Sequence, residues 1–86
     1  MKKSFLSPSD GRKSFYGKAV ILEDEAGTKY LKSYETIVCK CTAAGVFSRL
    51  WDDWSATTAR HVNAFRDHCG LAGLNKREWE QLKVEG

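Results

Sequence analysis

The sequence has little cysteine, a single proline and no long apolar run. No segment of the 86 residues approaches the roughly 18 apolar residues of a membrane-spanning helix, so we expect no contact with a membrane. Only Phe5 and Leu6 interrupt the polar start of the chain, so we expect no secretory signal either. Internal repeats are absent, and the length predicts one small globular domain.

The three cysteines, Cys39, Cys41 and Cys69, cannot all pair within one chain. Without a secretory signal they favour reduced thiols and a cytoplasmic location. Structural zinc needs about four nitrogen or sulfur ligands, but His61 and His68 lie two helical turns apart, about 10 Å along a helix axis. We therefore expect no metal and no cofactor, and interpret the cysteines as buried free thiols.

Motifs of catalysis are missing as well. The chain has no nucleophile elbow and no glycine-rich phosphate loop. Cys69 is expected near the C-terminal end of a helix, where the helix dipole disfavours a thiolate. We therefore expect that the protein is not an enzyme.

The first half of the chain favours strands. Residues 1–13 have no periodicity and four basic side chains, which predicts a flexible N-terminal tail before a single domain over 14–86. Segments rich in β-forming residues, separated by turn residues such as Gly27, predict three strands and leave a short fourth open, at 14–22, 28–34, 36–41 and 46–51.

The second half favours helices. Apolar residues from Ala59 to Cys69 recur every three or four positions, after Ser55 as the N-cap and before Gly70. Asn75 and Glu78 have the spacing of a capping box at the start of a second helix. We predict an α+β fold, an antiparallel three- to four-stranded sheet followed by two C-terminal helices packed on one face. The predicted core contains Phe15, Ala19, Ile21, Leu31, Ile37, Cys39, Val62, Phe65, Trp79 and Leu82.

Three segments of this pattern carry a resemblance. The strand segment S-Y-E-T-I-V at 33–38 precedes W-S-A-T-T-A-R-H-V-N-A-F at 54–65, and L-N-K-R-E-W follows at 74–79. They resemble a family of small proteins of unknown function from gut Firmicutes, their phages and mobile elements. The resemblance implies a source and a class but no activity. From the residues alone, the central segment is a strand-to-helix junction capped by Ser55, and a binding role for Arg60 and His61 is the alternative.

Two kinds of partner remain open. In one pleated run Tyr30, Lys32, Tyr34, Thr36 and Lys40 would share a face, as would Tyr16 and Lys18 on the neighbouring strand, and such a face could stack bases and contact phosphates. Three tryptophans favour a protein interface instead, although a small core also uses large side chains. The candidate binding residues are Tyr16, Lys18, Tyr30, Lys32, Tyr34, Trp51, Arg60 and His61.

The distribution of charge decides between these partners. Residues 1–18 carry five basic and one acidic side chain, whereas residues 19–86 carry nine basic and ten acidic ones. The net charge of +3 therefore belongs to the start of the chain, and the body is close to neutral. We predict a non-enzymatic binding protein, encoded by a phage or mobile element, that binds and modulates a host protein such as a defence or regulatory component. A nucleic-acid-binding accessory protein is the alternative, and an open sheet edge leaves a homodimer open as well.

Overall fold

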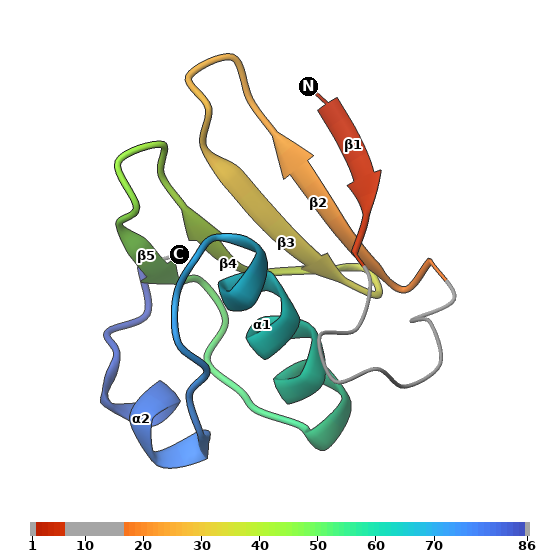
Figure 1. Ribbon diagram of the computed structural model, residues 1–86. Helices are drawn as coiled ribbons and strands as arrows, with labels where there is room; N and C mark the ends of the chain where they lie inside the picture. Colours follow the sequence, from red (N-terminus) through yellow and green to blue (C-terminus); the bar gives the residue numbers. More distant parts are fainter. Residues whose placement is uncertain (1, 7–16, 86) are drawn as a thin grey trace.

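The computed structural model describes residues 2–6 and 17–85. Within them a five-stranded antiparallel sheet is followed by two helices, which confirms the predicted α+β class (Figure 1). The strands lie side by side in chain order, so each pairs with the next. The elements are β1 (Lys2–Phe5), β2 (Ala19–Glu23), β3 (Lys29–Ser33), β4 (Thr36–Cys41), β5 (Phe47–Arg49), α1 (Ala56–His68) and α2 (Lys76–Gln81).

The first strand, β1, is one that the sequence did not predict. Lys2–Phe5 pairs antiparallel with β2, so a flexible tail over residues 1–13 was the wrong prediction for this stretch. Residues 7–13 of the expected tail lie outside the described residues. A strand of four residues is too short for a reliable alternation of polar and apolar positions. Strand β1 is stabilised by its pairing with β2, which a 2.9 Å hydrogen bond from Leu6 N to Ala19 O extends.

A β-bulge in β4 changes which residues enter the core. Leu31 pairs with Cys39 but Lys32 pairs with Ile37, so Val38 is an extra residue on β4. Val38 and Cys39 are both fully buried, whereas Ile37 is only half-buried and points away from α1 with Lys32. The predicted inward position of Ile37 was therefore wrong, because a strict two-residue period does not survive a bulge.

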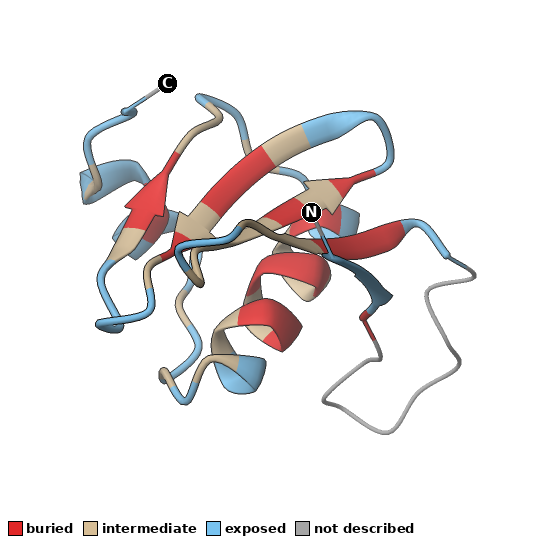
Figure 2. Cartoon of the chain, turned by 90° about the horizontal axis from the view of Figure 1, so that it is seen from above, coloured by how far each residue is buried: buried red, intermediate tan, exposed pale blue. Residues whose placement is uncertain are grey.

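Helix α1 lies against one face of the sheet, the inner face, as Figure 2 shows from above. Its N-cap is Ser55, as the sequence predicted, and the Ser55 side chain accepts a hydrogen bond from Thr58 N at 3.1 Å. Gly70 follows the helix end with a positive φ of 78°, the role expected for a glycine there. Seven predicted core residues are confirmed as buried: Ala19, Ile21, Leu31, Cys39, Val62, Phe65 and Trp79. Leu82 is half-buried against this core, and Phe15 lies outside the described residues.

The short helix α2 packs at the β5 end of the same face. Its capping box is confirmed, with reciprocal hydrogen bonds between Asn75 and Glu78. Trp79 is fully buried beside Phe47, with ring centres 6.4 Å apart, and its indole N–H donates to Asp53 O at 2.7 Å. A six-residue helix is not stable alone, so this one buried tryptophan stabilises α2 against the sheet.

The two edges of the sheet differ. The C-terminal segment runs along β5, where Val84 forms a parallel bridge with Arg49 and Glu85 N donates to Arg49 O at 2.7 Å. At the other edge β1 is exposed along its whole length. Strand β1 carries Lys2 and Lys3, and lysines on an edge strand typically hinder its pairing with strands of other chains.

Candidate binding surface

The face of the sheet opposite α1 forms the first candidate site. We call it the outer sheet face. Buried Leu31 points toward α1, so its neighbours Tyr30 and Lys32 point outward together with their cross-strand partners. No described helix covers this face (Figures 1 and 2). Strand register assigns to it Lys3, Phe5, Val20, Leu22, Tyr30, Lys32, Ile37, Lys40 and Ser48.

Charge on the outer sheet face has one sign. Among the described strand positions of this face, Lys3, Lys32 and Lys40 are the only ionisable side chains besides the Tyr30 hydroxyl, so none of these positions is acidic. Two carboxylates lie at its rim: Asp24, whose Oδ2 accepts a 3.4 Å hydrogen bond from the Tyr30 hydroxyl, and Glu35, which is 3.6 Å from the Lys32 ammonium but 93% exposed. Such an exposed pair contributes little, so the face stays basic.

Apolar side chains occupy the space between these lysines. Phe5 is 67% exposed, and the ammonium of Lys3 lies 5.5 Å from its ring centre. Leu22 and Ile37 are half-buried on the strands beside Tyr30 and Lys32. The face therefore offers apolar contact together with positive charge, a combination typical of an interaction surface.

The second group of predicted site residues lies at the tip of the β3–β4 hairpin. We call Lys18, Tyr34 and His61 the hairpin cluster. Tyr34 occupies the turn with a positive φ of 55°, a conformation that a bulky residue adopts at an energetic cost. Its ring lies 5.8 Å from that of His61 on α1 and 5.4 Å from the Lys18 ammonium. Tyr34 is half exposed, so this cluster reaches the surface.

His61 itself is buried and hydrogen-bonded. Its Nδ1 lies 2.7 Å from the Ser33 hydroxyl oxygen, which also lies 3.4 Å from the Thr58 hydroxyl oxygen. Burial, and then the neighbouring charge of Arg60, lower the pKa of His61 below its usual value. A serine beside a neutral histidine could in principle act as nucleophile and base. With only 3% and 2% of Ser33 and His61 exposed, their hydrogen bond instead stabilises the contact between β3 and α1.

The predicted site residues therefore do not form one surface. Tyr30 and Lys32 lie on the outer sheet face, whereas Lys18, Tyr34 and His61 meet at the hairpin tip. The predicted face that joined Tyr34 and Thr36 to Tyr30 was wrong, because the chain turns at Tyr34 and Thr36 pairs with inward-facing Ser33. Arg60 is partly buried on α1 next to His61 in sequence, and Tyr16 lies outside the described residues.

The tryptophans belong to the core more than to a surface. Trp51 and Trp54 are half-buried against the core, and the ring of Trp54 lies 5.5 Å from that of Trp79. The carbonyl of Trp51 accepts a 2.7 Å hydrogen bond from Arg49 Nε. Trp51 was predicted as a binding residue, and the structure places it apart from the outer sheet face, in the segment after β5.

Of the nine residues of the outer sheet face, the sequence predicted only Tyr30, Lys32 and Lys40 to lie there, and the residues it missed include Lys3 and Phe5. Both stand on β1, in the part of the chain that was predicted to be a tail. Their alternation over Lys3, Ser4 and Phe5 was the one available signal, and three residues are too few to separate a strand from chance. Lys40 was expected on the same face as Tyr30, and the structure confirms this, because the two residues are cross-strand partners on β4 and β3.

The cysteines gather at the inner face. Cys39 and Cys41 point toward α1, and Cys69 stands at the C-cap of that helix. Burial raises the pKa of the Cys39 thiol strongly. Within the described residues, no group of three or more His, Cys, Asp and Glu side chains could hold a metal ion.

Most of the chain matches a known family of proteins. Residues 5–81 match a family of unknown function, DUF8033. The chain belongs to this family. The matched segment begins at the last residue of β1 and ends with α2, so it spans strands β2 to β5 and both helices. Searches of curated proteins and of solved structures gave no significant match. Over residues 2–6 and 17–85, none of the helices is both long and apolar enough to span a bilayer.

Proposed function

We propose that this chain is a small, non-enzymatic binding protein whose outer sheet face binds an acidic, partly apolar segment of a partner protein. One observation carries the proposal. Three lysines surround exposed and half-buried apolar side chains on a face whose strand positions include no acidic residue. A partner with carboxylates between apolar residues complements both properties at once.

The balance of apolar and aromatic side chains favours a protein partner. The centre of the face holds aliphatic residues, with Leu22 beside Tyr30 and Ile37 beside Lys32. Aliphatic side chains pack against other apolar side chains but cannot stack on bases as aromatic rings do. The sequence-based expectations of a host protein as partner, a phage or mobile-element origin and a cytoplasmic location remain parts of this proposal.

Charge reversal tests the proposal. The double variant Lys3→Glu/Lys40→Glu changes two lysines of the outer sheet face, and Lys76→Glu/Lys83→Glu changes two exposed lysines elsewhere by the same charge. Each tagged protein is used to retain partners from host extract at moderate salt, and a retained protein is then purified and titrated directly. We expect the first variant to lower its affinity at least about tenfold and the second to leave it unchanged. Equal affinity for both variants would contradict the proposal.

A photo-crosslinker locates the partner independently of charge. The aromatic ketone p-benzoylphenylalanine is introduced in place of Phe5, and in a second protein in place of Val46, which is 59% exposed but lies in the β4–β5 turn. Crosslinking of the retained partner from position 5 and not from position 46 supports docking on the outer sheet face. Crosslinking from position 46 alone would place the interface elsewhere.

A second candidate function is the binding of single-stranded nucleic acid. Phe5 and Tyr30 share the outer sheet face with three lysines, and rings between positive charges can stack bases and neutralise phosphates. Fluorescence anisotropy with labelled single-stranded DNA and RNA at low salt tests it. Binding that falls steeply with salt and is lost in Phe5→Ala would support this candidate over a protein partner, and no binding at low salt would eliminate it.

A further inference from the structure

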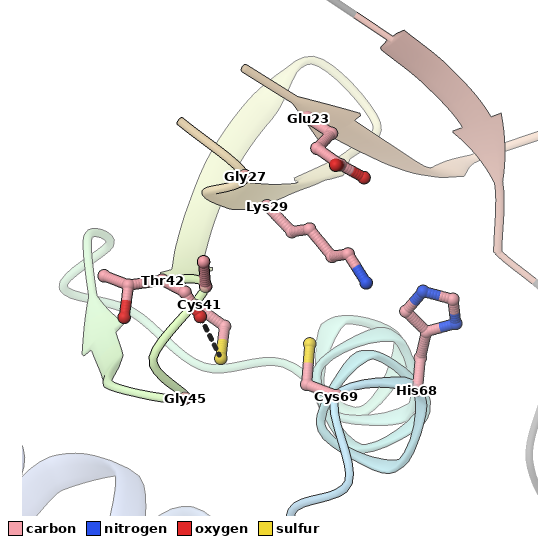
Figure 3. Close-up of a pocket in the computed structure, with 9 residues that line it drawn as sticks. Glu23, Gly27, Lys29, Cys41, Thr42, Gly45, His68 and Cys69 are labelled. Carbon is pink, nitrogen blue, oxygen red and sulfur yellow. Dashed lines mark hydrogen bonds between the residues drawn. The ribbon is translucent and has the colours of Figure 1, made fainter. Parts of the chain in front are cut away.

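A cavity lies between the inner face of the sheet and the C-terminal end of α1. Its volume is about 370 Å³, and the turns around Gly27 and Gly45 form parts of its wall. Cys41 from β4 and Cys69 from the end of α1 both line it, and their sulfur atoms lie in the same part of the cavity (Figure 3). Cys39 is fully buried and does not line the cavity.

The fold fixes both cysteines where they stand. Cys41 pairs with Lys29 on one side and Phe47 on the other, so it is held in the middle of three strands. The backbone N–H of Cys69 donates to the carbonyls of Phe65 and Arg66, both at 3.0 Å. The Cys41 thiol donates a hydrogen bond to the carbonyl of Thr42 at 3.7 Å (Figure 3). The positions of the two cysteines are therefore fixed by the sheet and by the end of the helix, and not by a mobile loop.

We propose that Cys41 and Cys69 form a reversible disulfide when the chain meets a low-molecular-weight disulfide such as oxidised glutathione. The Cys69 thiolate attacks one sulfur of oxidised glutathione, a new sulfur–sulfur bond forms, and one glutathione thiolate leaves. The Cys41 thiolate then attacks the Cys69 sulfur and expels the second glutathione. Together the two protein thiols lose two protons and two electrons, and one oxidised glutathione becomes two reduced molecules.

Accessibility determines the order of these steps. Cys69 is half-buried at the cavity, whereas Cys41 is buried, so Cys69 meets the reagent first. Lys29, Glu23 and His68 also line the cavity, and the Lys29 side chain extends toward the side of the cavity where Cys69 and His68 lie (Figure 3). The charges of Lys29 and Arg66 favour the thiolate, but burial, with a smaller effect from Cys41, raises the pKa of Cys69 to about 11. The reaction is therefore slow at neutral pH and accelerates as the pH rises.

The disulfide would join β4 covalently to the end of α1. It would close a loop from residue 41 to residue 69 that contains β5 and the whole of α1. A cross-link of this length restricts the unfolded chain, so the oxidised protein should unfold at a higher temperature than the reduced protein. This switch is independent of the outer sheet face, which lies on the opposite side of the sheet.

Intact mass and disulfide mapping test the proposal on the full chain. The reduced protein is incubated with an excess of oxidised glutathione at neutral and at mildly alkaline pH. We expect the loss of two hydrogen atoms from the protein mass, a mapped link between Cys41 and Cys69, and faster formation at the higher pH. A reducing agent should reverse all three changes. Retention of free thiols at both pH values, or a mapped link that involves Cys39, would overturn the proposal.

Three serine variants identify the attacking and resolving thiols. Cys41→Ser should stop at the mixed disulfide of Cys69 with glutathione, and Cys69→Ser should form no internal disulfide. Cys39→Ser is the matched control, and it should form the internal disulfide as the unmodified chain does. An internal disulfide in Cys69→Ser would contradict the assignment. The map of the unmodified chain decides the question even if Cys39→Ser fails to fold.

Discussion

The hydroxyl oxygen of Ser33 lies 2.7 Å from Nδ1 of His61, and this contact joins the end of β3 to the middle of α1. Both residues are buried, and Thr58 adds a third polar side chain to the same site. Ser33 comes from the strand segment, and Thr58 and His61 from the helix segment, on which the family resemblance rested. The structure brings these two segments together in a buried polar contact that orients the helix on the sheet.

Removal of the Ser33 hydroxyl should destabilise the fold. Ser33→Ala leaves the buried imidazole without this partner, and we expect a loss of about 1–3 kcal/mol in the free energy of unfolding. Urea denaturation measures it. The control is Thr57→Ala, which removes an exposed hydroxyl from the first turn of α1 and should change stability by about 0.5 kcal/mol or less. Equal effects in the two variants would show that the buried contact contributes little.

Stability should fall as the pH drops below about 6.5, the usual pKa of histidine. Burial and the charge of Arg60 lower the pKa of His61 in the folded state, so in this window the unfolded chain binds more protons than the folded chain. The free energy of unfolding therefore decreases with falling pH and levels off below the folded-state pKa. Urea denaturation from pH 7.5 to 5 should show this slope, and His61→Gln should reduce it. A ring resonance of His61 that titrates at or above pH 6.5 in NMR would contradict the prediction.

Arg49 should not be replaceable by lysine. Its guanidinium donates to the carbonyls of Trp51, Trp79 and Leu82 at 2.7, 3.2 and 3.1 Å and lies 5.1 Å from the Trp79 ring centre. Lysine carries the same charge but cannot direct donors in this forked geometry, so Arg49→Lys should cost about 2 kcal/mol or more. Exposed Arg77→Lys on α2 should change stability by less than about 0.5 kcal/mol in the same denaturation experiment. Similar values for both would mean that α2 is not held by Arg49.

Local signals in the sequence predicted most of the fold. Ser55 and the Asn75–Glu78 pair are caps whose hydrogen bonds depend on neighbours within one helical turn, and both were confirmed. Apolar periodicity likewise placed Val62 and Phe65 in the core. The pairing of β1 with β2 was not predictable in this way, because it depends on a partner strand distant in the sequence.

The candidate site was harder to predict than the fold. Tyr34 was expected beside Tyr30, but the positive φ of Tyr34 turns the chain, and its ring lies near His61 instead. Phe5, the most exposed large apolar side chain described, belongs to the strand that the sequence did not reveal. A surface depends on which strands are neighbours and where each turns, and neither follows from the pattern of a single segment.

The bulge in β4 makes a prediction that opposes the simple reading of the sequence. A strict two-residue period would place Ile37 inward and Val38 outward, whereas the structure buries Val38 fully and leaves Ile37 half-buried on the outer sheet face. Threonine keeps the β-branched shape but adds a hydroxyl that is costly to bury. Val38→Thr should therefore cost about 1–3 kcal/mol in urea denaturation, and Ile37→Thr clearly less. A larger loss in Ile37→Thr would mean that β4 has no bulge at Val38.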